Sequence, residues 1–208
     1  MDAALPTQPR SGIPKVMGVL LIVFASIYTL GSVLGAIGAL FGDAFMNILP
    51  TIADSTPEIK KSGINLEQLF GQLRGVYRVQ GLEKLATAAI SAYGIYAGTQ
   101  LMHYSAQGVR LAIWWAMAAL AYLVVEVWIF AIYIHPLLTK FFKTLTHQVK
   151  PLMGKDAPAI DALPALVGSM GYSSTIIYAV IMAIFPVLML VLLNTPRAKR
   201  ACGVEKIF

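Results

Sequence analysis

The chain has 208 residues, of which 58% are hydrophobic and only 12% are charged, with a formal net charge of +6. A soluble domain carries roughly a quarter charged residues, so this composition excludes an ordinary water-soluble protein. The basic residues lie beside long apolar runs and form no continuous stripe, which argues against nucleic acid as a partner and favours the surface of a lipid bilayer.

Four apolar runs predict four transmembrane helices, at residues 16–42, 82–104, 111–135 and 173–194. The first is free of charge over roughly 27 residues. At about 1.5 Å per residue, a helix of this length is longer than the ~30 Å hydrocarbon core of a bilayer. A cleaved signal peptide is the alternative for this run, but its apolar core would span only about 7 to 15 residues. The run is therefore predicted to stay as a membrane span.

The other three runs differ in strength. The second is the weakest, because polar residues such as Ser91 and Gln100 interrupt it. Only Glu126 interrupts the third, and Pro136 is expected to end it, since a proline disfavours helical conformation in the residue before it. The fourth is followed directly by a basic tail, which is typical of a stop-transfer ending.

The polar segments set the predicted topology. An inner turn at 105–110 separates two outer loops at 43–81 and 136–172, and apolar residues at helical spacing predict a short amphipathic helix in each outer loop. Basic residues are densest beside the helix ends in the tails and the turn, so the positive-inside rule places both termini in the cytoplasm. The predicted fold is all-α, a single membrane domain over 1–208 whose four helices form an antiparallel bundle.

Glu126 is the candidate for function, because a carboxyl group inside a span is costly to bury. We expect no lysine or arginine to pair with it, so that a neutral carboxyl bonds to polar residues at similar depth, with Ser32, Ser91 and Tyr93 as candidates. Three interpretations stay open: a hydrogen bond that holds helices together, a proton or cation pathway, and a contact with lipid or a partner.

Glycines at four-residue spacing occur in the first two spans. They are Gly31, Gly35, Gly38 and Gly42 in the first, and Gly94 and Gly98 in the second. Small residues let helix backbones approach closely in lipid. We therefore predict that these glycines pack the first two helices together within one chain, with contact between copies in a homo-oligomer as the alternative.

Residues for enzyme chemistry are not found together. His103, His135 and His147 lie far apart, whereas a zinc protease needs two histidines on one helical turn, and Cys202 is the one cysteine. There is no glycine-rich phosphate loop and no Gly-x-Ser-x-Gly motif. We expect no catalytic residue, metal or cofactor, and a protein that is not an enzyme.

The stretch from Tyr93 to Val124 carries Gly94, Gly98 and Leu101, then a short turn and Gly108-Val109-Arg110. It resembles a hairpin of small uncharacterised bacterial four-helix integral membrane proteins. The resemblance implies a bacterial plasma (inner) membrane and no activity. The expected function is a structural or interaction subunit of that membrane, in contact with lipid, a membrane-protein partner or a second copy. The alternative is a small transporter or an ion- or proton-conducting subunit that uses Glu126.

Overall fold

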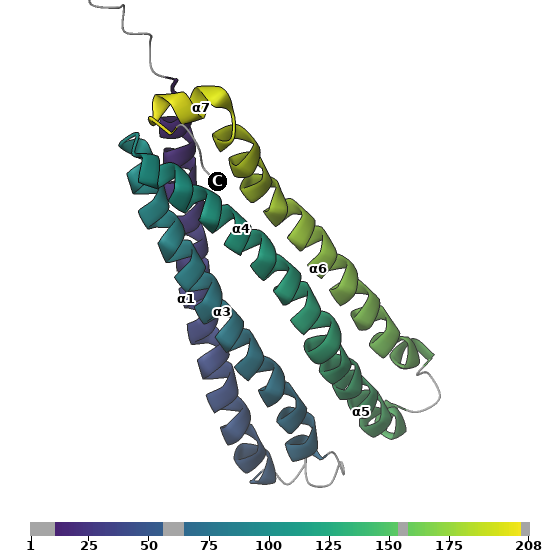
Figure 1. Cartoon of the computed structure of the whole chain (residues 1–208). Helices are drawn as coiled ribbons and strands as arrows, with labels where there is room; N and C mark the ends of the chain where they lie inside the picture. Colours follow the sequence, from purple (N-terminus) through teal and green to yellow (C-terminus); the bar gives the residue numbers. More distant parts are fainter. Residues whose placement is uncertain (1–10, 56–64, 154–157, 205–208) are drawn as a thin grey trace, which may run out of the picture. The chain divides into compact units, whose positions relative to one another are not determined.

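The protein is built from helices, as Figure 1 shows for a computed structural model that describes residues 11–55, 65–153 and 158–204. The elements are α1 (Ile13–Asp54), α3 (Leu66–Met102), α4 (Ala106–Ile129), the π-helix η1 (Phe130–Ile134), α5 (His135–Met153), α6 (Pro158–Leu193) and α7 (Pro196–Ala201). No strand occurs within these described ranges. The prediction of an all-α protein is confirmed.

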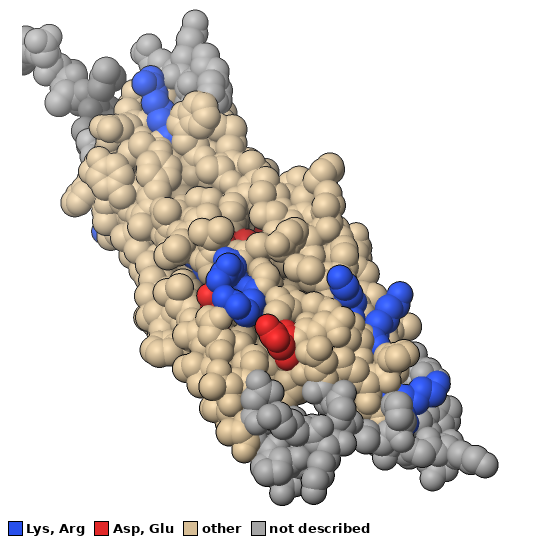
Figure 2. All heavy atoms as spheres, turned by 90° about the horizontal axis from the view of Figure 1, so that it is seen from below, with Lys and Arg blue, Asp and Glu red and all other residues tan. Residues whose placement is uncertain are grey.

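Three helical segments are long and apolar enough to cross a bilayer, at Ile13–Ile52, Ala106–Lys150 and Ala162–Leu193. Their outer faces carry large apolar side chains that nothing in the described chain covers, such as Phe41, Trp128 and Val180. A soluble monomer rarely exposes apolar surface on this scale, whereas lipid covers it without cost. Most of the surface in Figure 2 is accordingly uncharged, with acidic and basic side chains in small groups.

The second predicted span, 82–104, is helical within α3, but α3 is not among the three apolar segments. All the charged residues of α3 lie in 66–84, and hydroxyl and amide side chains such as Ser91 and Gln100 lower the hydropathy of the rest. Four membrane crossings therefore remain a prediction.

Both predicted outer loops are shorter than expected, because the helices on either side extend into them. α1 continues to Asp54 and α3 begins at Leu66, while α5 fills much of 136–172. Pro136 does not end the third helix. It follows η1, in which the His135 amide donates to the carbonyl of Phe130 one residue further back than in an α-helix. The wider turn moves preceding carbonyls away from the proline ring, so the helix continues.

The described residues group into two compact units, where the sequence predicted one membrane domain. Of the described residues, unit 1 comprises 11–29, 89–121 and 183–204, and unit 2 comprises 30–55, 65–88, 122–153 and 158–182. Helices α1, α3, α4 and α6 each contribute residues to both units.

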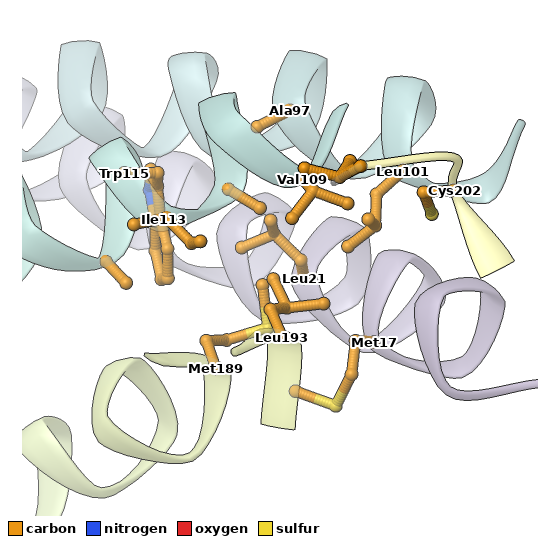
Figure 3. Close-up of a cluster of buried hydrophobic side chains, with 13 residues drawn as sticks. Met17, Leu21, Ala97, Leu101, Val109, Ile113, Trp115, Met189, Leu193 and Cys202 are labelled. Atoms are coloured by element: carbon orange, nitrogen blue, oxygen red, sulfur yellow. The ribbon is translucent and has the colours of Figure 1, made fainter. Parts of the chain in front are cut away.

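Unit 1 has an apolar core, drawn in Figure 3, where side chains converge from α1, α3, α4 and the end of α6. The backbones of α1 and α3 meet at Gly18 and Gly98: a Cβ at Gly98 would lie 2.9 Å from the Gly18 carbonyl oxygen. The indole nitrogen of Trp115 donates to the Ile90 carbonyl at 3.0 Å, which ties α4 to α3. Cys202 is buried beside this core.

Unit 2 is held by polar contacts as well as packing. Asp43 of α1 pairs with Arg74 and Arg78 of α3, at 3.5 and 3.3 Å. Between α6 and the π-helical region, the rings of His135 and Tyr172 lie 5.4 Å apart. Unit 2 also contains a cavity.

Candidate functional site

A cavity in unit 2 has a volume of about 600 Å³ and is lined from α1, α3, α4, η1 and α6. Its lining consists of Gly35, Gly38, Ala39, Tyr77, Gln80, Glu83, Lys84, Glu126, Phe130, Ile134, Ser174, Thr175 and Tyr178. Sites for small molecules commonly measure roughly 300 to 1,000 Å³ and combine apolar walls with a few polar groups. This cavity has both properties.

Glu126 of α4 faces the cavity and meets a cation. Its Oε1 lies 3.9 Å from Nζ of Lys84 on α3, with the glutamate and lysine side chains 17% and 35% exposed. The expectation that no lysine or arginine would pair with Glu126 is therefore corrected. Lys84 stands at the edge of the second span, and its long side chain reaches along the helix surface.

Gly35 of α1 makes room for this lysine. A Cβ at Gly35 would lie 3.2 Å from Cγ and 3.3 Å from Cδ of Lys84. The glycine thus accommodates an aliphatic stem that leads to the ion pair with Glu126. The close contact at this position is between α1 and a side chain of α3, not between two backbones.

A second carboxyl group, Glu83, lines the same cavity and did not stand out in the sequence. It is only 7% exposed, and its Oε1 has no hydrogen-bond partner among the described residues. Glu83 and Glu126 are close enough to interact electrostatically. A buried acceptor without a donor is costly, which marks Glu83 as a residue with a role beyond packing.

Tyr122 joins α4 to α3 beside these carboxyl groups. Its hydroxyl donates to the backbone carbonyl of Glu83 at 2.6 Å and lies 3.1 Å from the hydroxyl of Thr87. The bond holds the start of the α3 span against α4. It therefore positions the two helices from which Glu83, Lys84 and Glu126 reach the cavity.

The polar residues predicted to accompany Glu126 lie elsewhere. Ser32 is buried in unit 2 but does not line the cavity, while Ser91 is buried and Tyr93 exposed in unit 1. Ser174, Thr175 and Tyr178 of α6 line the cavity instead. Counting residues from helix ends gives depth alone, whereas the rotation of each helix about its axis decides which side chains meet.

The predicted packing glycines have three different environments. Gly98 meets Gly18 of α1, Gly42 lies against the ring of Tyr77, and Gly94 lies under the Trp115 ring of α4. Gly31 and Gly38 face open space, with no described atom within 4 Å of a Cβ placed there. The predicted close contact of Gly31 and Gly38 with the second helix is therefore not seen: Gly38 lines the cavity, and no described atom lies within 4 Å of a Cβ at Gly31.

Within the described ranges, no group of three or more histidine, cysteine, aspartate or glutamate residues is arranged to hold a metal ion. The site is instead a cavity with largely apolar walls, two carboxyl groups and one ammonium group. No protein-family model, curated protein or solved structure matches this chain.

Proposed function

We propose that the protein is a small membrane transporter that binds a polar solute or an ion in the unit 2 cavity and moves it across the bilayer. One observation carries the proposal: Glu126 opens onto a cavity of about 600 Å³ together with Glu83, Lys84 and several hydroxyl groups. A carboxyl that only holds helices together needs one or two hydrogen bonds, whereas a pathway needs several polar groups around it.

The proposal includes four membrane crossings in an antiparallel bundle, with α3 as the second. Its residues 85–102 contain no Asp, Glu, Lys or Arg, and at 1.5 Å per residue they extend roughly 27 Å, close to the hydrocarbon thickness. A polar span of this kind is stable in lipid where its polar face lines a cavity. The basic residues near the chain ends support cytoplasmic termini, and the hairpin resemblance supports a bacterial inner membrane.

A second candidate, a structural or interaction subunit, is favoured by one face of α1. Gly31 faces open space there, beside the exposed side chains of Ile27 and Leu34. Glycines on an uncovered membrane face permit the close approach of another helix, from a second copy or another protein. Co-purification from native membranes would test this role, which is compatible with transport.

The decisive experiment is flux in liposomes that contain the purified chain, with proton-sensitive dyes and electrical recording of charge movement. We expect the wild type to show flux and Glu126→Gln to lose about tenfold or more of it, since a hydrogen bond to a charged group contributes about 1.5–3 kcal/mol. Glu67→Gln is the matched control, because Glu67 is exposed on α3 and outside the cavity.

Thermal unfolding of each variant shows whether the substitution preserves the fold. Because Gln at position 126 leaves Lys84 without its carboxylate, the double variant Glu126→Gln, Lys84→Gln is measured beside it. A wild type that conducts no protons and moves no solute, anionic, cationic or neutral, would overturn the transport proposal.

A further inference from the structure

We infer that the cavity binds a small organic cation, through an ammonium or guanidinium group that Glu83 and Glu126 hold together after Lys84 has been displaced from Glu126. The inference rests on the proposed function, since it names the ligand class of the same cavity. In this inference the Lys84 ammonium takes the place of the ligand cation beside Glu126 when no ligand is bound.

The charges of the cavity select a cation. Glu83, Glu126 and Lys84 line it, so one negative charge stays uncompensated when all three are ionised. One monovalent cation neutralises the group. An anion would add to the excess negative charge, and a neutral solute would leave that charge uncompensated. Either is unfavourable, because charges interact strongly where the local dielectric constant is low.

Glu83 supplies an independent reason to expect a donor-bearing ligand. Its side chain is more than nine-tenths buried, lines the cavity, and has an Oε1 without a hydrogen-bond partner among the described residues. A carboxylate only accepts hydrogen bonds, and an ammonium group offers three N–H donors. A ligand ammonium could therefore bond to both carboxylates at once.

Lys84 cannot serve both carboxylates in the same way. Its ammonium lies 3.9 Å from Glu126 and also acts electrostatically on Glu83, yet Glu83 Oε1 has no hydrogen-bond partner among the described residues. The space beside Gly35 guides the lysine stem toward Glu126. One acceptor is then paired internally and the other is left for a ligand.

The ion pair is also weak enough to open. Its N–O distance of 3.9 Å is long and the lysine is about one-third exposed. Partly exposed pairs of this kind contribute roughly 0–1 kcal/mol, so a ligand ammonium that bonds two carboxylates can replace a lysine that bonds one. The flexible lysine stem can turn its ammonium away from Glu126 without backbone movement.

A bare metal ion fits less well than an organic cation. Calcium takes about six or more oxygen ligands, and here a lysine ammonium competes for one of only two carboxylates. A cavity of about 600 Å³ is also far larger than the ~30 Å³ that a water molecule occupies, so a ligand of several heavy atoms has room.

Calorimetry on the purified full chain in detergent tests the inference, with n-butylammonium as the probe and n-butyramide and butyrate as neutral and anionic controls. We expect binding of butylammonium alone. Glu83→Gln and Glu126→Gln should each weaken it by about tenfold or more, as expected for loss of a charged hydrogen bond, while Glu67→Gln leaves it unchanged.

Lys84→Met gives the most specific result. It removes the internal competitor, so the affinity for butylammonium should rise, by up to about fivefold, from the loss of a pair worth up to ~1 kcal/mol. Lys143→Met, an exposed lysine on α5 outside the cavity, is the control and should change nothing. If Lys84→Met weakens binding instead, the lysine is part of the site and the inference is wrong.

Equal binding of butyramide or butyrate, or no binding of butylammonium, also overturns the inference. If a Gln variant fails to fold, Glu83→Asp and Glu126→Asp retain the charge and should still bind the cation, more weakly than the wild type. Cation binding without flux supports this inference and contradicts the transport proposal. Flux of a neutral solute without cation binding supports the transport proposal and contradicts this inference.

Discussion

Glu83 and Lys84 are adjacent in the chain yet have opposite environments. The glutamate is buried with an unpaired oxygen, while the lysine is about one-third exposed and reaches Glu126. Both stand where the charged part of α3 gives way to the apolar part, and charges at such a boundary are ordinarily assigned to the headgroup region. Only the packing of α1 and α4 against this turn shows that both residues line a cavity.

Gly98 is the position where a single methyl group should matter most. We expect Gly98→Ala to destabilise the protein by about 1–3 kcal/mol, because the new Cβ would lie 2.9 Å from the Gly18 carbonyl oxygen and 3.3 Å from the Ile22 amide nitrogen. Backbone atoms cannot move aside as a flexible side chain can. Thermal unfolding in detergent measures the change.

Gly31→Ala is the matched control, since it adds the same methyl group to open space on α1. It should stabilise the helix by about 0.5–1 kcal/mol, as alanine does relative to glycine inside helices. Equal effects of the two substitutions would contradict the close contact at Gly98.

Tyr122→Phe tests the hydroxyl that joins α4 to α3. The variant loses the 2.6 Å bond to the Glu83 carbonyl, and we expect a loss of about 1 kcal/mol in unfolding free energy, typical of one hydrogen bond. Tyr96→Phe, at an exposed tyrosine of α3, should have no effect. An unchanged stability for Tyr122→Phe would show that the bond contributes nothing.

At the scale of elements, the π-helix explains why the third helix is longer than predicted. η1 provides Phe130 and Ile134 to the cavity wall and precedes Pro136. π-turns are uncommon and often occur at functional sites, where they change the direction of the side chains that follow. Here the same turn accommodates a proline and shapes a cavity.

Pro136→Ala should stabilise the protein, by up to about 3 kcal/mol, because alanine restores a backbone donor and removes the ring that disfavours a helix interior. It should also lower ligand affinity if the wide turn relaxes toward an α-helix and moves Phe130 and Ile134. Pro196→Ala is the control: Pro196 begins α7 at a position that favours proline, so no gain is expected. A destabilised Pro136→Ala would show that the proline stabilises this turn, which contradicts the expected gain.

At the scale of the whole molecule, the number of crossings can be counted by cysteine labelling. Native Cys202 is only 6% exposed, so a polar thiol reagent would report its burial and not its side of the membrane. In a Cys202→Ala background, Gly12→Cys and Arg197→Cys place exposed thiols beside the two ends of the described chain, and Asn65→Cys places one before α3.

Four crossings with cytoplasmic ends predict that a membrane-impermeant reagent added to intact bacteria labels Asn65→Cys alone. If only the three most apolar helices crossed, Gly12→Cys and Arg197→Cys would lie on opposite sides, and one of them would be labelled. That result would remove α3 from the membrane and with it the transport proposal.

Composition and periodicity were sufficient to predict the helical class and the long apolar helices at the first, third and fourth runs. These features depend on local chemistry, because a bilayer requires long uncharged segments whose backbone groups bond within the segment. The same local rule went wrong at Pro136, where a non-standard turn lets the helix continue.

The site required the tertiary structure. Glu126 was visible from the sequence as the lone carboxyl in an apolar run, but its surroundings were not. Whether Lys84, Ser32 or Tyr178 lies beside it depends on how each helix is rotated about its axis and placed along it. Packing decides those two quantities: Gly35 admits the lysine stem, and Tyr122 fixes α4 against α3. The sequence alone predicts how deep each residue lies in the membrane. Contacts between helices that are far apart in the chain decide which polar groups share a cavity.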